Sequence, residues 1–151
     1  MKRTYLSVTV FIISFIVIGT SFSPRTSGSL AEDVLIQTNR FRTSHGLNKL
    51  TINGRLNKIA QKHSADMAND RVDFGHNGFA ERNADAKRAT RNAHNFAEDV
   101  AYGPSSGKDV VSMWSTSPGH RRNMLRHYKY IGIGIAKDRQ GRNYYTQVFC
   151  D

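Results

Sequence analysis

The sequence predicts an α+β fold in which helices pack against a small antiparallel sheet. Segments with the apolar period of helices come first in the chain, two segments that alternate like strands close it, and shorter helical segments lie between them. The chain has 151 residues, which is enough for one domain with its own core. These observations favour a single layered domain over a repeat or two-domain architecture.

Two helices are expected in the first half of the domain. A capping pattern begins at Ser29, and apolar residues follow at helical spacing from Leu30 to Thr43. A second helix is expected over residues 55–70, with an apolar stripe that includes His63. A histidine within such a stripe is more often a core residue than a ligand, and we interpret His63 in this way.

The middle of the chain predicts shorter elements. Residues 71–79 are rich in Gly and Asn and indicate a loop, and residues 80–91 indicate a polar helix. Residues 95–102 alternate as an extended segment, with Glu98 on its apolar side. A short helix around Trp114 follows, and another is expected from Pro118.

Two strands are expected at the end of the chain. The segment YIGIGIA, residues 130–136, places three isoleucines on one face and Gly132 and Gly134 on the other. A glycine face allows close approach of a helix or a ligand, and we favour the helix. Residues 144–150 return after a turn and predict a hairpin partner.

The first residues have the pattern of an export signal. Lys2 and Arg3 precede an apolar run that is short for a membrane span, which predicts a signal peptide over residues 1–23. Pro24 is a poor neighbour for cleavage, so an uncleaved anchor is the alternative, and a membrane is expected as a partner only in that case. Residues 24–28 read as a linker and residues 29–151 as the domain, with a secreted or extracytoplasmic location.

The composition is strongly basic, with a formal net charge of +10 at pH 7. This favours anionic partners, but the basic residues are spread along the chain, with clusters in residues 87–91 and 121–129. The export pattern argues against intracellular nucleic acid, so no nucleic-acid partner is expected. Cys150 is the single cysteine, which excludes a disulfide within the chain.

Three residues are candidates for chemistry: His76 in FGHNG, Glu98 in NFAEDV and His120 in SPGH. A carboxylate on an apolar strand is costly unless it is paired, and His120 lies at a helix start, where neutral imidazole is favoured. Two imidazoles and one carboxylate suit zinc with an open position, or acid–base chemistry. Their spacing matches no compact metal motif, and the sequence contains no nucleophile elbow or phosphate-binding glycine loop.

A set of segments in a fixed order resembles a known family. They are Asn39-Arg40, GLNKLTIN, AQKHSADMA, FGHNGF, AED, WSTSPGHRRNML, YIGIGIA and YYTQVF, and they cover nearly all of residues 31–150. Together they resemble the CAP superfamily of cysteine-rich secretory, antigen 5 and pathogenesis-related proteins, also called the SCP domain. The similarity is greatest to short bacterial members.

The resemblance implies an α–β–α sandwich with a cleft where histidines and acids meet. His76 and His120 match the family's two cleft histidines, which bind zinc or a similar divalent ion in some members, and Glu98 matches its acid. The family's Gly-Glu-Asn is Ala97-Glu98-Asp99 here. Ser117, which the resemblance places with His76, Glu98 and His120 among the cleft residues, stands near the position where many members carry a second cleft Glu. The cleft therefore has one acid fewer here than in those members.

Three functions remain open on this basis. The first is an exported binding or effector module whose cleft holds a divalent ion, zinc or another, and whose ligand is a lipid, a glycan or a protein. The second is a secreted metal-dependent hydrolase with Glu98 as general base. The third is a basic protein that binds an anionic extracellular polymer. The first is favoured, an enzyme is the less favoured reading, and no organic cofactor is expected.

Overall fold

The computed structural model describes Met1, residues 29–91 and residues 93–151. Apart from Met1, the predicted signal peptide (1–23) and linker (24–28) lie outside the described residues. Across the described ranges, no helix is both long enough and apolar enough to cross a membrane.

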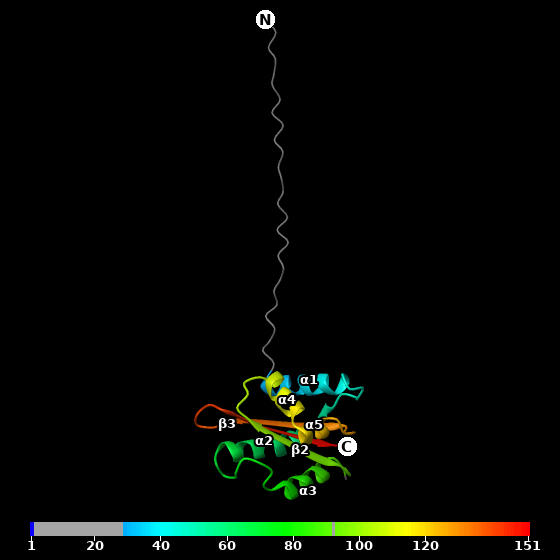
Figure 1. Cartoon of the computed structure of the whole chain (residues 1–151), viewed down its shortest axis with the longest axis vertical. Coiled ribbons are helices and arrows are strands. Elements are labelled where there is room, and N and C mark those ends of the chain that lie inside the picture. The colour runs from blue at the N-terminus through cyan, green and yellow to red at the C-terminus, as the bar shows by residue number, and fades with distance from the viewer. Residues whose placement is uncertain (2–28, 92) are drawn as a thin grey trace.

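Helices cover both faces of the sheet (Figure 1). One face carries α1 (Leu30–Thr43), α4 (Gly107–Thr116) and α5 (Pro118–Met124). The other carries α2 (Gly54–Ala68) and α3 (Phe79–Ala89). The α–β–α sandwich is therefore confirmed, with helix ends within one or two residues of those expected.

The sheet has four strands in the order β1 (Thr51–Ile52), β3 (Tyr130–Lys137), β4 (Asn143–Cys150) and β2 (Phe96–Tyr102). The predicted hairpin of β3 and β4 is present, and β2 is antiparallel to β4.

The expectation of a wholly antiparallel sheet needs correction, because β1 pairs with β3 in parallel. Two residues are too few for β1 to show a pattern in the sequence. The side chain of Asn39 holds the backbone directly before β1. It accepts from the Leu50 N–H at 2.7 Å and donates to the Leu50 carbonyl at 3.1 Å.

The two glycines of β3 allow α2 to lie directly on the sheet. A Cβ atom at Gly132 would stand 2.2 Å from the Leu56 carbonyl carbon, and one at Gly134 would stand 2.2 Å from that of Ala60. Both contacts are with backbone and leave no room for a side chain. The close partner is therefore a helix, as expected, while Ile131 and Ile133 face the opposite core.

The larger core lies between the sheet and the α1, α4 and α5 layer. Trp114 is 1% exposed at its centre, and its indole N–H donates to the Val100 carbonyl at 3.1 Å. The packing of Trp114 against Tyr145, with ring centroids 6.4 Å apart, joins α4 to the sheet. Trp114 is thus the core anchor that its helical position predicts.

Candidate functional site

Glu98 lies in the middle of β2 with its side chain fully enclosed, at 0% exposure. The guanidinium of Arg82 donates to both carboxylate oxygens, from Nε to Oε2 at 2.5 Å and from Nη2 to Oε1 at 2.7 Å. The Nδ1 atom of His76 lies 2.8 Å from the same Oε1. The partners that a buried carboxylate requires are therefore present.

A glycine-flanked loop positions His76 and Arg82. Gly75 and Gly78 have positive φ angles of 145° and 78°, which side-chain-bearing residues rarely adopt. Gly78 is the N-cap of α3, and Arg82 follows one turn later on that helix. Arg82 also donates from Nη1 to the Asn77 carbonyl at 2.6 Å, which fastens the loop to the helix.

The electrostatics of this cluster favour charged groups. Burial alone would raise the pKa of Glu98, but hydrogen bonds from His76 and Arg82 outweigh it and hold the pKa below its usual value. The hydrogen bond to Glu98 raises the pKa of His76 in turn. The Glu98 carboxylate is thus held between a guanidinium and an imidazole whose protonated form it favours.

His63 is a core residue that also reaches this network. It is 3% exposed, and its Nε2 atom lies 2.9 Å from the Gly75 carbonyl and 3.9 Å from Glu98 Oε1. Burial lowers the pKa of His63 and favours the neutral ring. The interpretation of His63 as a core residue with a hydrogen-bond partner is confirmed, but nothing in the sequence indicated that it neighbours Glu98.

His76 and His120 meet in an open groove. The groove has a volume of about 570 Å³, and its other lining residues are mostly apolar: Phe74, Gly75, Val100, Ala101, Tyr102 and Met113. His120 is the third residue of α5, as expected. Burial lowers the pKa of His120, and the charge of His76 lowers it further. The neutral imidazole expected at a helix start is thus favoured, but the main cause is burial rather than the helix N-terminus.

An aromatic shelf, defined as Phe74, Tyr102 and Tyr144, forms one side of the site. Phe74 packs edge-on against Tyr102 with centroids 4.9 Å apart, and Tyr102 stacks on Tyr144 at 5.6 Å. Phe74 and Tyr102 are 48% and 47% exposed, as is Met113 at 46%. Large apolar side chains gathered in this way mark a surface suited to binding.

Ser117 does not line this groove. It ends α4 and begins α5, and its hydroxyl makes no hydrogen bond to any residue in the described part of the chain. Its backbone N–H donates to the Trp114 carbonyl at 3.2 Å, and its carbonyl accepts from the Arg121 N–H at 2.8 Å. Its contribution is thus to the junction between the helices.

The histidine pair offers two nitrogen ligands for a divalent cation. No group of three or more His, Cys, Asp or Glu side chains is arranged to hold a metal within residues 29–91 and 93–151. The contact between His76 Nδ1 and Glu98 leaves Nε2 of His76 free, which is the usual orientation of a metal-binding histidine held by a carboxylate. The donor set therefore fits an ion with an incomplete protein coordination shell.

Nothing in the sequence identified two further residues that lie at the site, Arg82 and Asp99. Arg82 lies in a polar helix where charge is expected, so nothing singled it out. Asp99 was noticed only as a departure from the family pattern. It is fully buried on the other face of β2, where it accepts from Asn123 Nδ2 at 2.8 Å and from Gln147 Nε2 at 3.0 Å.

The profile of the CAP, cysteine-rich secretory protein family matches residues 35–149, and the chain belongs to this family. Among solved structures, an extracellular protein with an SCP domain from Bacillus anthracis superposes with a TM-score of 0.68 at 25% identity, over 80% of this chain and 40% of that one. The resemblance read from the ordered segments is therefore confirmed.

Two curated relatives come from Bacillus subtilis strain 168. The membrane protein YlbC is 31% identical over 123 residues, covering 78% of this chain and 33% of YlbC. YkwD is 29% identical over 133 residues, covering 86% of this chain and 50% of YkwD. The chain thus spans a third to a half of these relatives.

Proposed function

We propose that this chain is an extracytoplasmic binding module that takes its ligand in the groove between the aromatic shelf and the two histidines. An extracytoplasmic location is supported by the predicted export signal and by similarity to proteins described as extracellular and as membrane-bound. The ligand places an apolar or ring-shaped part against Phe74, Tyr102 and Met113, and a polar end near His76 and His120.

The burial and the hydrogen-bond partners of Glu98 are the main support for this proposal. A general base needs a free lone pair within reach of the proton that it removes. Glu98 has no exposed side-chain surface, and its two oxygens already accept from Arg82 and contact His76. The buried acid therefore supports a role in holding the histidine and the loop, and it gives little support to the hydrolase alternative.

A divalent cation such as Zn²⁺ belongs to the proposal. His76 and His120 would hold it, and the ion would add a point for a polar ligand atom to bind. The contact with Glu98 orients His76, but it also favours the protonated ring, so proton release should accompany metal binding.

The groove is tested with two probes, oleate for a lipid and chitotriose for a glycan, titrated into the purified chain. We expect one probe to bind and Tyr102→Ala to weaken it by about tenfold or more, because a buried large side chain is worth ~2 kcal/mol. Ile36→Ala, at a position 42% exposed on α1, is the matched control and should have no effect. If neither probe binds, or if both variants weaken binding equally, the groove is not the ligand site.

The metal is tested separately by calorimetry with zinc on the wild type and a His76→Ala/His120→Ala double variant. Binding that the double variant loses would support the histidine pair as ligands. Equal binding by both proteins, or none by either, would remove the metal from the proposal and leave the groove to bind without it.

A further inference from the structure

The surface between α1 and α4 carries a second open groove, which shares no lining residue with the groove of the proposed function. Its volume is about 410 Å³. Two exposed cations line it, Arg40 from α1 and Lys108 from α4. The other lining side chains are neutral: Gln37, Phe41, Ser44, Val111, Ser112 and Ser115. The groove is therefore basic, with no acidic residue among those that line it.

The guanidinium of Arg121 on α5 is held beside this groove by neutral partners. It lies 5.2 Å from the ring centroid of Phe41, which lines the groove. Its Nη2 donates to Nε2 of His45 at 2.9 Å, and Nδ1 of His45 lies 2.7 Å from the Phe41 carbonyl. A carbonyl can only accept, so the His45 proton is on Nδ1 and the ring is neutral. Arg121 is thus fixed in place while its charge stays uncompensated.

The protein supplies no carboxylate partner to these cations. Arg40, Lys108 and Arg121 make no ion pair with any residue of the described ranges. Residues 2–28 and 92, which lie outside those ranges, contain no Asp or Glu. An anion that neutralises this surface must therefore come from another molecule.

Two stretches of chain without acidic residues meet at this surface. Residues 34–53 and 110–137 contain no Asp or Glu. The buried guanidinium of Arg42 joins the two stretches, because its Nη1 donates to the carbonyls of Met124 and Arg126 at 2.6 and 2.9 Å. The acids of α1 and α4 all lie in the first turns of those helices. Positive charge thus predominates where α1 ends and α5 lies.

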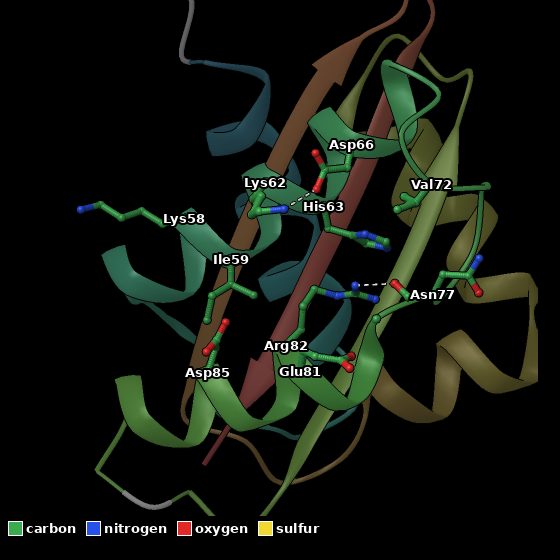
Figure 2. A pocket seen from close by; sticks show the side chains of 11 residues that line it. Lys58, Ile59, Lys62, His63, Asp66, Val72, Asn77, Glu81, Arg82 and Asp85 are labelled. Atoms are coloured by element: carbon green, nitrogen blue, oxygen red, sulfur yellow. Dashed lines mark hydrogen bonds and ion pairs between the residues drawn. The ribbon is translucent and has the colours of Figure 1, made fainter.

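The pocket between α2 and α3 shows the contrary arrangement (Figure 2). Lys62 pairs there with Asp66 at 2.5 Å, and Arg82 pairs with Glu98. The third cation of that pocket, Lys58, points away from the space between the helices in Figure 2. Cations that face the α2–α3 pocket are therefore compensated within the protein, whereas those of the α1–α4 groove are left for an external anion.

We propose that the α1–α4 groove, with Arg121 beside it, binds a linear phosphodiester polymer outside the cytoplasm. Arg40 and Lys108 attract successive phosphates, and the remaining N–H groups of Arg121 donate to a further one. The cations come from three helices, and each exposed cation alone contributes little. A chain with repeated charges can contact all of them at once and release several counterions, which a single phosphate cannot do.

The side chains of the groove favour a polymer over a lipid bilayer. Helices that bind to a membrane surface combine their cations with large exposed apolar side chains that enter the bilayer. The apolar residues of this groove are Phe41, which is half-buried, and Val111, which is 5% exposed. None of the large apolar side chains that are exposed in the described part of the chain lines it.

The test titrates the purified whole chain with a poly(glycerol phosphate) oligomer and follows binding by calorimetry. We expect saturable binding that weakens about twentyfold between about 50 and 200 mM salt, as release of counterions from three phosphates predicts. Arg40→Gln/Arg121→Gln should bind about tenfold more weakly. Arg55→Gln/Lys58→Gln removes the same charge from exposed positions on α2, on the opposite face of the sheet, and should change the affinity by about twofold or less.

A variant that keeps every charge supplies a second measurement. Phe41→Leu removes the ring beneath Arg121 and should weaken binding by about twofold to fivefold, the range for an exposed cation–π contact. Vesicles of phosphatidylglycerol, compared at equal phosphate concentration, should bind more weakly than the oligomer. Absence of saturable binding, equal losses in the two charge variants, unaltered affinity of Phe41→Leu, or tighter binding to the vesicles would each overturn the proposal.

Discussion

Glu98 and Asp99 are neighbours on β2, and their carboxyl groups lie on opposite faces of the sheet in opposite electrostatic surroundings. Glu98 faces α2 and α3, where Arg82 and His76 lower its pKa. Asp99 faces the α1 and α5 side, where its partners are the amides of Asn123 and Gln147. Burial there raises the pKa of Asp99 to about 7.

The difference shows that the partner, rather than depth, decides the charge state of a buried carboxylate. Both acids are almost wholly enclosed: counted over the whole residue, backbone included, 3% of Glu98 and 0% of Asp99 is exposed. A guanidinium offsets the loss of hydration for one, while neutral amides offset it incompletely for the other. The Glu98 face is thus built for a fixed charge, and the Asp99 face tolerates a proton near neutral pH.

The largest effect is expected from removal of the guanidinium. Arg82→Met leaves a buried carboxylate without its main cation, and we expect a loss of about 3–5 kcal/mol in the free energy of unfolding. Because the pKa of Glu98 is lowered on folding, this loss is present above pH 4.5 and shrinks as the pH falls through the folded-state pKa.

Urea unfolding at pH 7 and pH 3.5 measures this loss, and Arg88→Met is the control. Arg88 is on the same helix, but its pair with Asp85 is 72% and 50% exposed, so a change below about 0.5 kcal/mol is expected. Equal losses in the two variants would contradict the importance given to the Arg82–Glu98 pair.

The next effect has the opposite sign. Asp99→Asn should stabilise the protein by up to about 4 kcal/mol at pH 8, since the pKa of Asp99 is raised by about three units and each unit corresponds to ~1.4 kcal/mol. The new amide can donate to Gln147 Oε1 once the Gln147 amide turns over, and Gln147 can then donate to Thr38, which is now its hydrogen-bond partner at 3.2 Å.

The pH dependence of Asp99→Asn provides the sharper measurement. The folded-state pKa is raised from 3.8 to about 7, so the wild type loses stability as the pH rises through this interval. The advantage of the variant should therefore grow over the same interval and remain constant above it. Asp73→Asn, at an exposed loop position, is the control, and an advantage that is already complete at pH 4 would disprove the assignment.

A smaller loss of stability is expected when the side chain that contacts both Glu98 and Asp99 is removed. Asn123 on α5 donates from Nδ2 to Asp99 Oδ1 at 2.8 Å and to the Glu98 carbonyl at 3.3 Å. Asn123→Ala should lower the free energy of unfolding by about 1–2 kcal/mol, because it leaves buried acceptors without a donor. Thermal unfolding measures the loss, and the exposed Asn48→Ala serves for comparison.

The smallest effect is the titration of the histidines beside Glu98. Nuclear magnetic resonance of the wild type should show a pKa above 6.5 for His76 and below 6.5 for His120. Stability from the His76–Glu98 contact should be present below pH 6.5 and decline as the pH rises through the folded-state pKa of His76. The reverse order of the two histidines would show that Glu98 does not govern His76.

The sequence was sufficient for most elements because local physics specifies them. The Ser29 hydroxyl accepts from the Glu32 N–H at 3.2 Å at the start of α1, as its capping pattern predicts. The alternation of isoleucine and glycine in β3 specified both faces of the strand and the approach of α2. The parallel pairing of β1 was missed because it depends on Asn39, eleven residues away and on another element.

The sequence by itself determined the family and the layered fold, and it singled out His76 and Glu98, which contact each other, since ordered motifs and apolar periods are local properties. Only the tertiary structure decided the charge states and the surfaces. Arg82 and Asn123 reach the two acids of β2 from elements 16 and 24 residues away. These charge states depend on the fold because the charge of a buried group is set by neighbours that are distant in the sequence. The pocket between α2 and α3 likewise exists only when the two helices pack.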